Sequence, residues 1–148
     1  MTKGPVVTTY RRSRALRVGD TIVGWLIWTG LVPNGYLLTT VGRRTGRERT
    51  TPVAVVAHEG RRWLVSPYGA VAWVFNARAH GSVVLRRRFT RREYTVRELP
   101  AQEAGPVLRR YYVLSAPSRP YINATKDSPV ERFVAQAPRH PVFELTPR

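Results

Sequence analysis

The sequence has 148 residues, a length that favours a single domain with its own hydrophobic core. It contains no cysteine, which excludes disulfide bonds, thiolate nucleophiles and thiolate metal sites. Its 25 Lys and Arg against 9 Asp and Glu give a formal net charge of +16 at pH 7. A charge of this size attracts polyanions, which include nucleic acid, anionic lipid and multiply negative small molecules.

Residues 1–30 are expected to form a loose arm followed by an amphipathic helix. Arginines at positions 11, 12, 14 and 17 come first, and Trp25 and Trp28 follow among aliphatic residues. A helix of about 15 residues fits this stretch, which Asp20 interrupts and which is too short to span a bilayer. Such a helix can pack over the rest of the domain, roof a substrate pocket or make peripheral contact with an anionic membrane. The sequence leaves these three roles open.

Two strands, 36–41 and 50–57, are predicted on either side of an arginine-rich loop. The loop holds two glycines and four arginines, which are Gly42, Gly46, Arg43, Arg44, Arg47 and Arg49. Glycine can adopt positive φ, so successive N–H groups can face one concavity, and arginines supply planar charged groups for phosphate or carboxylate. The loop is therefore either an anion-binding site or a solvated hairpin tip, and its composition does not decide between them.

The remaining chain continues with short strands and helices. The predicted strands are 36–41, 50–57, 62–66, 82–89, 92–99 and 142–145. The predicted helices are 70–80, ended by Gly81; 100–114, broken by 115–120; and 128–136, with Ser128 and Pro129 as its cap and first residue. A two-residue turn at Glu59 and Gly60 makes the third strand antiparallel to the second. About six antiparallel strands with three to four short helices predict an α+β fold built on a closed or split β-barrel, in one domain over 1–148.

Several kinds of site are not supported by the residue pattern. The three histidines lack metal-ligand spacing, and His58 and His140 are expected to be solvated, so no metal site is predicted. No G-x-S-x-G surrounds Ser66, and no paired carboxylates occur. The basic hairpin at 86–92 is consistent with sequence-independent nucleic-acid binding, although no specific nucleic-acid motif is present.

The arginine-rich loop and its flanking strands also resemble a family signature. The segment 38–53 is similar to the motif T-T-x-G-R-[KR]-[ST]-G-x-x-R-x-x-P-L of the deazaflavin-dependent nitroreductases, which use coenzyme F420 and belong to the flavin/deazaflavin oxidoreductases. The matching positions are Thr39, Thr40, Gly42, Arg43, Arg44, Thr45, Gly46, Arg49 and Pro52. A second match follows in residues 63–66, Gly69, Trp73, Asn76 and Ala79. This resemblance implies the split barrel of FMN-binding relatives, in agreement with the predicted strands.

The resemblance also implies a set of site residues. The residues expected to bind F420 are Gly42, Arg43, Arg44, Thr45, Gly46, Arg49, Pro52, Leu64, Val65, Ser66, Ala72, Trp73 and Asn76. Tyr111, Tyr112 and Tyr121 fall where the family carries tyrosines near the substrate pocket, and one of them would position the substrate or donate a proton. The residues expected to act in catalysis are Ser66, Tyr112 and Tyr121. Pro67 stands where relatives often carry a lysine.

The function implied is a reductase that transfers a hydride from reduced F420 to an electron-poor small molecule, such as a quinone, an enone or a nitroaromatic. Two alternatives stay open: a non-catalytic split-barrel binder of F420, FMN or a lipophilic ligand, and a basic protein that binds nucleic acid or a membrane surface. We expect a cytoplasmic monomer or homodimer without a specific nucleic-acid partner. Membrane association through the N-terminal helix is left open.

Overall fold

The computed structural model describes residues 34–148, so the helix expected within residues 1–30 lies outside the described part of the chain. The strands are β1 (Gly35–Val41), β2 (Glu48–His58), β3 (Arg61–Val65), β4 (Ser82–Arg87), β5 (Thr90–Glu98) and β6 (Val142–Pro147). The helices are α2 (Ala72–His80), α3 (Ala101–Leu114) and α4 (Val130–Gln136), with short 3-10 helices η1 (Ala116–Tyr121) and η2 (Ala137–Arg139). No helix within residues 34–148 is long and apolar enough to cross a membrane.

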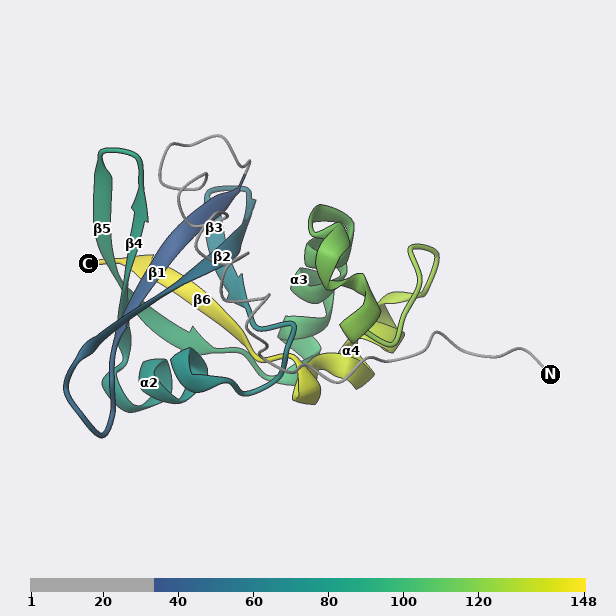
Figure 1. The fold of residues 1–148 in the computed structure, drawn as a ribbon. Coiled ribbons are helices and arrows are strands. Elements are labelled where there is room, and N and C mark those ends of the chain that lie inside the picture. The colour runs from purple at the N-terminus through teal and green to yellow at the C-terminus, as the bar shows by residue number, and fades with distance from the viewer. Residues whose placement is uncertain (1–33) are drawn as a thin grey trace.

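The six strands close into one antiparallel barrel in the order β1-β2-β3-β6-β5-β4. The barrel is closed by pairs that are distant in sequence: Leu38 lies opposite Leu85, and Leu64 lies opposite Phe143. Closure leaves no unpaired strand edge, so every strand has two hydrogen-bonded neighbours. The predicted α+β barrel of six antiparallel strands is confirmed. Figure 1 shows α2 across one end of the barrel, with α3 and α4 beside it.

Side-chain alternation along the strands produces two hydrophobic cores. Val55 and Leu64 belong to the cluster that fills the barrel, together with residues of α2. Their neighbours Val56 and Val65 belong to a second cluster, which packs against α3 and α4 around Phe133. Successive residues of a strand point to opposite faces, so β2 and β3 contribute to both clusters at once. The barrel is thereby buried on its interior and along the side that α3 and α4 cover.

The local turn chemistry agrees with the sequence. Glu59 and Gly60 have φ values of 50° and 77°, as a two-residue hairpin turn with positive φ at both central positions requires. Gly81 ends α2 in the left-handed region, at φ 75°. Both predicted features are confirmed.

The predicted cap of the last helix was wrong. Pro129 lies before α4 with φ −66° and ψ 160°, and no side chain caps the helix. The Ser128 hydroxyl oxygen instead accepts a hydrogen bond from the Thr125 amide at 2.8 Å, so it closes the preceding turn. Local competition of this kind is common for serine, whose hydroxyl can serve a turn as well as a helix.

The close packing of α3 on α4 depends on Gly105. A Cβ built on Gly105 would clash with the Val134 side chain and lie 3.0 Å from the Val134 amide nitrogen. Replacement of a helical glycine by alanine ordinarily stabilises a protein by about 1 kcal/mol. We expect the opposite sign here: Gly105→Ala should lower the free energy of unfolding by about 1–3 kcal/mol, because the two helices must move apart.

Urea unfolding of the purified variants measures this effect. Gln102→Ala is the control, because Gln102 is exposed on the same helix and its replacement should change stability by less than about 0.5 kcal/mol. A Gly105→Ala variant as stable as the parent, or more stable, would show that the two helices tolerate the added methyl group.

Candidate functional site

A cavity of about 1100 Å³ lies between β2 and the segment that joins α3 to η1. One end is formed by the loop between β1 and β2 and by α2. The other end is formed by residues 111–118, at the end of α3 and in η1. Leu38 and Phe143, which fill the barrel, do not line this cavity, whereas Trp73 and Val53 of the same cluster do. The site therefore lies largely beside the barrel and borders its core at Trp73 and Val53.

The glycines give the arginine-rich loop its shape. The Gly42 amide donates to the Arg47 carbonyl and the Gly46 amide donates to the Gly42 carbonyl, both at 2.8 Å. A Cβ on Gly42 would lie 2.8 Å from the Thr45 hydroxyl oxygen, and Gly46 has φ 69°. Because both glycine amides bond within the loop, they do not form the anion-binding concavity that the sequence suggested. Three of its four arginines, Arg43, Arg44 and Arg49, line the cavity instead.

Asn76, on α2, holds this loop in place. Its side-chain oxygen accepts hydrogen bonds from the Arg43 amide at 3.1 Å and from the Arg43 guanidinium at 3.2 Å. Its amide nitrogen donates to the Thr40 hydroxyl at 3.2 Å. Asn76 and Thr40 are both 2% exposed, so water does not compete strongly for these bonds. The Arg43 guanidinium also lies 5.0 Å from the centre of the Phe75 ring.

The loop end of the cavity is cationic. Arg43, Arg44 and Arg49 line it together with Thr45 and one acid, Glu48. Within residues 34–148, none of the loop arginines lies within salt-bridge distance of a carboxylate. Their charge is therefore available to an anionic ligand.

The middle of the cavity is apolar. Val53 and Ala54 on β2, Val65 on β3, Pro67 and Trp73 form its walls. Trp73 is 9% exposed and its ring centre lies 5.7 Å from that of Phe143, so it is a core residue with one side at the cavity. Such walls suit a flat aromatic ring system.

The far end carries three linked hydroxyl groups. The Tyr111 phenol oxygen lies 2.9 Å from the Ser118 hydroxyl oxygen, which lies 3.0 Å from that of Ser115. Tyr111 and Ser118 are each 3% exposed, and all three residues line the cavity. Burial raises the pKa of the Tyr111 phenol, although its hydroxyl partners oppose the shift. Tyr111 is therefore a neutral hydrogen-bond donor at physiological pH.

Most of the predicted cofactor-binding residues line the cavity: Gly42, Arg43, Arg44, Thr45, Arg49, Pro52, Val65, Ala72, Trp73 and Asn76. The structure brings these residues together from the β1–β2 loop, β2, β3 and α2. Two other predicted residues, Gly46 and Leu64, do not line the cavity. Gly46 turns the loop, and Leu64, which is 0% exposed, packs in the barrel core.

The three predicted catalytic residues do not line the cavity. Ser66 is fully buried, and its hydroxyl donates to the Gly69 carbonyl. The Tyr112 hydroxyl donates to the Ala124 carbonyl at 3.1 Å, away from the cavity. Tyr121 contacts the cavity only indirectly, since its ring packs edge-on against Tyr68 at 4.8 Å. Of the three tyrosines that the sequence placed near the substrate pocket, Tyr111 lines the cavity, because the helix turns adjacent residues to different sides.

His140 does not line the cavity but contacts a residue that does. The expectation that His140 is solvated was wrong. It is 4% exposed, and its Nδ1 lies 2.8 Å from the carbonyl oxygen of Pro67, which lines the cavity. A carbonyl accepts, so Nδ1 carries the proton, and Nε2 is buried without a hydrogen-bond partner among residues 34–148. Burial lowers the pKa of His140; the bond to Pro67 opposes this shift and the charge of Arg139 adds to it. No local motif identifies His140, because its contact joins residues 73 positions apart.

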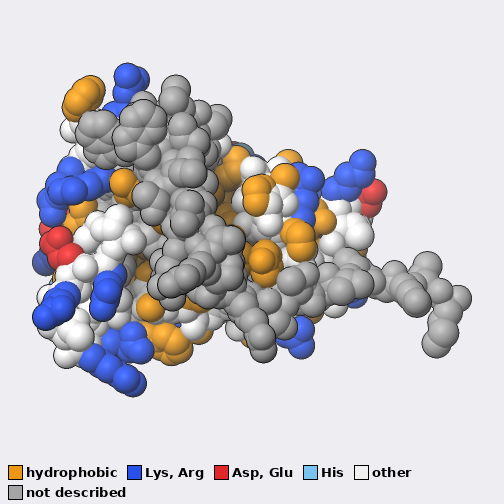
Figure 2. All heavy atoms as spheres, in the orientation of Figure 1, with side chains coloured by type: hydrophobic (Ala, Val, Ile, Leu, Met, Phe, Trp, Pro, Cys, Tyr) orange, Lys and Arg blue, Asp and Glu red, His pale blue; other side chains and the backbone are white. Residues whose placement is uncertain are grey.

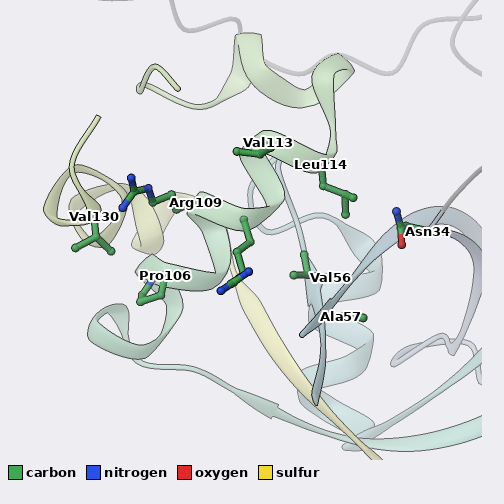
Figure 3. A pocket seen from close by; sticks show the side chains of 9 residues that line it. Asn34, Val56, Ala57, Pro106, Arg109, Val113, Leu114 and Val130 are labelled. Carbon is green, nitrogen blue, oxygen red and sulfur yellow. The ribbon is translucent and has the colours of Figure 1, made fainter. Parts of the chain in front are cut away.

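A second hollow of about 520 Å³ lies between α3 and the end of β2. Figure 3 shows Val56 and Ala57 on one side and Arg109, Val113 and Leu114 on the other. Leu114 lines both this hollow and the larger cavity. The two spaces are therefore neighbours at that side chain.

Residues 5–135 match the family of F420H(2)-dependent quinone reductases. No curated protein matches the chain. Among solved structures, an F420-H2 dependent reductase is 24% identical with a TM-score of 0.55, covering 77% of this chain and 95% of that one. A protein described as a domain-swapped dimer is 22% identical with a TM-score of 0.56, covering 89% and 96%. An FMN-binding protein from Nostoc punctiforme, related to pyridoxamine 5′-phosphate oxidase, is 13% identical with a TM-score of 0.54, covering 95% and 83%. These structural likenesses show the split-barrel fold.

The buried imidazole of His140 predicts a specific loss of stability in acid. The unfolded chain protonates this residue near its ordinary pKa of 6.5, whereas the folded chain does so only at lower pH. The stability that neutral His140 contributes is thus present above pH 6.5 and is lost as the pH falls below it. His140→Asn should weaken this dependence, because an asparagine amide can donate to Pro67 without titrating.

Urea unfolding at about pH 7.5 and about pH 5.5 checks the sign of this effect. The parent should lose more free energy of unfolding between the two pH values than His140→Asn does. Equal losses would show that His140 does not contribute to the acid sensitivity.

Proposed function

This chain belongs to the F420H2-dependent quinone reductases, and we propose that it reduces an electron-poor small molecule, with a quinone as the best-supported class, in the cavity beside its barrel. It is an oxidoreductase, and F420 is its cofactor. The observation that carries the proposal is the single cavity that joins a cationic loop, an apolar middle and a hydroxyl-lined end. The cationic loop suits a charged cofactor tail, the apolar middle suits a flat ring, and the hydroxyl-lined end suits a polar group of the substrate.

The donor set fits F420. The cofactor carries a phosphodiester and a glutamate tail, and the loop end offers Arg43, Arg44, Arg49 and Thr45 to such anions. The deazaflavin ring is flat and aromatic, and Val53, Val65, Pro67 and Trp73 form apolar walls. A cavity of about 1100 Å³ has room for both a ring system and a substrate.

Arg44 and Arg49 are the proposed ligands of the anionic groups, because they line the cavity and are exposed. Arg43 has a different role: its guanidinium bonds to Asn76, so it holds a fixed charge at the mouth of the site. Gly42, Gly46, Thr45 and Pro52 shape the loop and its exit into β2. Asn76 acts as a positioning residue through Arg43.

Bound F420 supplies the hydride in its reduced form. The protein must then stabilise the negative charge that develops on the substrate. Tyr111 is suited to this task because it is a neutral donor at the far end of the cavity, and Ser118 and Ser115 connect it to the cavity surface. We assign Ser66, Leu64, Tyr112 and Tyr121 to supporting roles, since their side chains lie behind or beside the lining.

The loop arginines give a prediction for cofactor affinity. Arg44→Ala and Arg49→Ala should each weaken F420 binding by about 1.5–3 kcal/mol, the range for a hydrogen bond to a charged group. Arg47→Ala is the matched control, because it removes the same charge from the same loop at a residue that does not line the cavity. Titration of F420 fluorescence measures all three affinities. If Arg47→Ala weakens binding as much as the other two variants, only the overall loop charge matters.

The hydroxyl end gives a prediction for turnover. Tyr111→Phe should lower the rate of quinone reduction by about 100-fold while F420 affinity stays unchanged, because only the donor at the substrate end is lost. Tyr112→Phe is its matched control: it removes the neighbouring phenol, which is bonded to the Ala124 carbonyl, and should leave the rate nearly unchanged. Steady-state kinetics with a soluble quinone, together with cofactor titration, separates the two effects. A larger rate loss for Tyr112→Phe would reassign the donor to Tyr112.

A further inference from the structure

The three hydroxyl groups at the end of α3 form a hydrogen-bonded row from the protein interior toward its surface. The middle oxygen, Ser118 Oγ, lies 2.9 Å from the Tyr111 phenol oxygen and 3.0 Å from Ser115 Oγ. Tyr111 and Ser118 are each 3% exposed, whereas Ser115 is half-buried. The row thus joins a phenol to which water has little direct access with a hydroxyl group that water can reach.

Each hydrogen bond of this row can run in either direction. A hydroxyl group carries one proton and also accepts, so either oxygen of each pair can be the donor. When Ser115 donates to Ser118 and Ser118 donates to Tyr111, the phenol proton is free to point at a ligand in the cavity. The same row can therefore present a proton at its inner end and take one up at its outer end.

The backbone around η1 fixes the spacing of the row. The Ser115 amide donates to the Tyr111 carbonyl at 2.9 Å, and the Ser118 amide donates to the Ser115 carbonyl at 3.2 Å. The Arg119 guanidinium donates to two carbonyls in the last turn of α3, at 2.9 and 3.1 Å, which satisfies the open end of that helix. The three oxygens are thus held in place by the fold itself.

The proposed reaction needs a proton in addition to the hydride. A quinone that becomes a hydroquinone gains two hydrogens: the hydride of reduced F420 brings one of them with both electrons, and a proton must follow to the other oxygen. The proton that F420 loses on its oxidation is released to solvent, so the overall reaction is balanced. After Tyr111 has given its proton to the substrate, the phenolate must be protonated again before the next turnover.

The cavity has few other groups that could return this proton. Of the described residues that line it, Glu48 is the one acid, at the opposite end beside the arginine-rich loop, and none is a histidine. Figure 2 shows mainly apolar and basic side chains over α3. Burial raises the pKa of the Tyr111 phenol, although Ser115 and Ser118 oppose the shift, so the phenolate takes up a proton readily.

We propose that Ser118 and Ser115 relay a proton from solvent to Tyr111 after each reduction. The Tyr111 phenolate takes the proton of Ser118, Ser118 takes that of Ser115, and Ser115 takes one from water. Every O–H bond that breaks is replaced by the next proton along the row, so the row returns to its starting charge. This inference rests on the proposed function, because Tyr111 is the donor named there.

Steady-state kinetics of the F420-loaded protein with a soluble quinone tests the relay. Ser118→Ala should lower the rate about tenfold and leave F420 affinity and the quinone KM unchanged. Its rate should rise with the concentration of a small acid such as imidazolium, which can protonate the phenolate in place of the missing hydroxyl group, whereas the rate of the parent should not. Ser128→Ala is the matched control, because it removes a hydroxyl group from a residue that does not line the cavity.

Two results of this experiment would overturn the relay. One is a rate for Ser118→Ala equal to that of the parent. The other is a slow rate that imidazolium does not restore, because Ser118 would then only orient Tyr111. Ser115→Ala, at the half-buried end of the row, should show the same dependence on imidazolium, so the test does not rely on one variant. Kinetics of Ser115→Ala like those of the parent would contradict the outer step.

A double variant shows whether the serine acts through the phenol. In a Tyr111→Phe background, Ser118→Ala should cause no further loss of rate, because the relay ends at the phenol oxygen. A further loss would give Ser118 a role that bypasses Tyr111 and would overturn the proposal.

Ultraviolet titration of the tyrosines, on protein without cofactor, measures the contact independently of turnover. The Tyr111 signal is the difference between the parent and Tyr111→Phe. Ser118→Ala should move this ionisation to higher pH, because the Ser118 hydroxyl lowers the pKa of Tyr111, and an unchanged midpoint would remove the inner link of the relay. If Tyr111→Phe is slow and Ser118→Ala is not, only the relay fails. A parent that reduces no quinone would instead overturn the proposed reaction.

Discussion

The hydrogen bonds of Asn76 connect the cationic loop to the rest of the molecule. One buried amide accepts from both the backbone and the side chain of Arg43 and donates to Thr40, so it joins α2, β1 and the loop at one point. An amide is well suited to this position because it supplies an acceptor and donors without a charge of its own. A carboxylate there would hold the same arginine but would also neutralise it. The neutral contact leaves the positive charge of Arg43 available at the mouth of the cavity.

The cavity is formed by elements that lie far apart in the sequence. The loop and β2 supply the cationic and apolar parts, whereas Tyr111, Ser115 and Ser118 come from the end of α3 and from η1. Gly105 allows α3 to lie close to α4, and both helices pack on the outer side of β2 and β3 through the second hydrophobic cluster. The position of the hydroxyl groups is therefore set by helix packing that involves no residue of the loop.

The parts of the structure that local chemistry determines were predictable from the sequence. Alternation identified the six strands, and Gly60 and Gly81 identified a turn and a helix end. The motif from Thr39 to Pro52 indicated the arginine-rich loop, which we propose binds the cofactor. The parts that depend on long-range contacts were not. The sequence did not distinguish Tyr111 from Tyr112, because the choice depends on which side of α3 faces β2. The burial of His140 results from a contact with Pro67 that no local pattern specifies. The free glycine amides expected in the loop were already bonded within it.

Because the interior of the barrel is filled, substitutions that reshape the cavity need not disturb the barrel core. Leu38, Leu64 and Phe143 occupy the space inside the strands and do not line the cavity, whose walls come largely from β2, the β1–β2 loop, α2 and the α3–η1 segment. A substitution at Ser115 or Leu114 alters the shape of the cavity without opening a void in the barrel core, so its cost in folding stability should be small. Substrate preference and structural integrity are thereby assigned to different sets of residues. The lineage can explore new substrates at the α3–η1 segment while the scaffold that binds the cofactor stays constant.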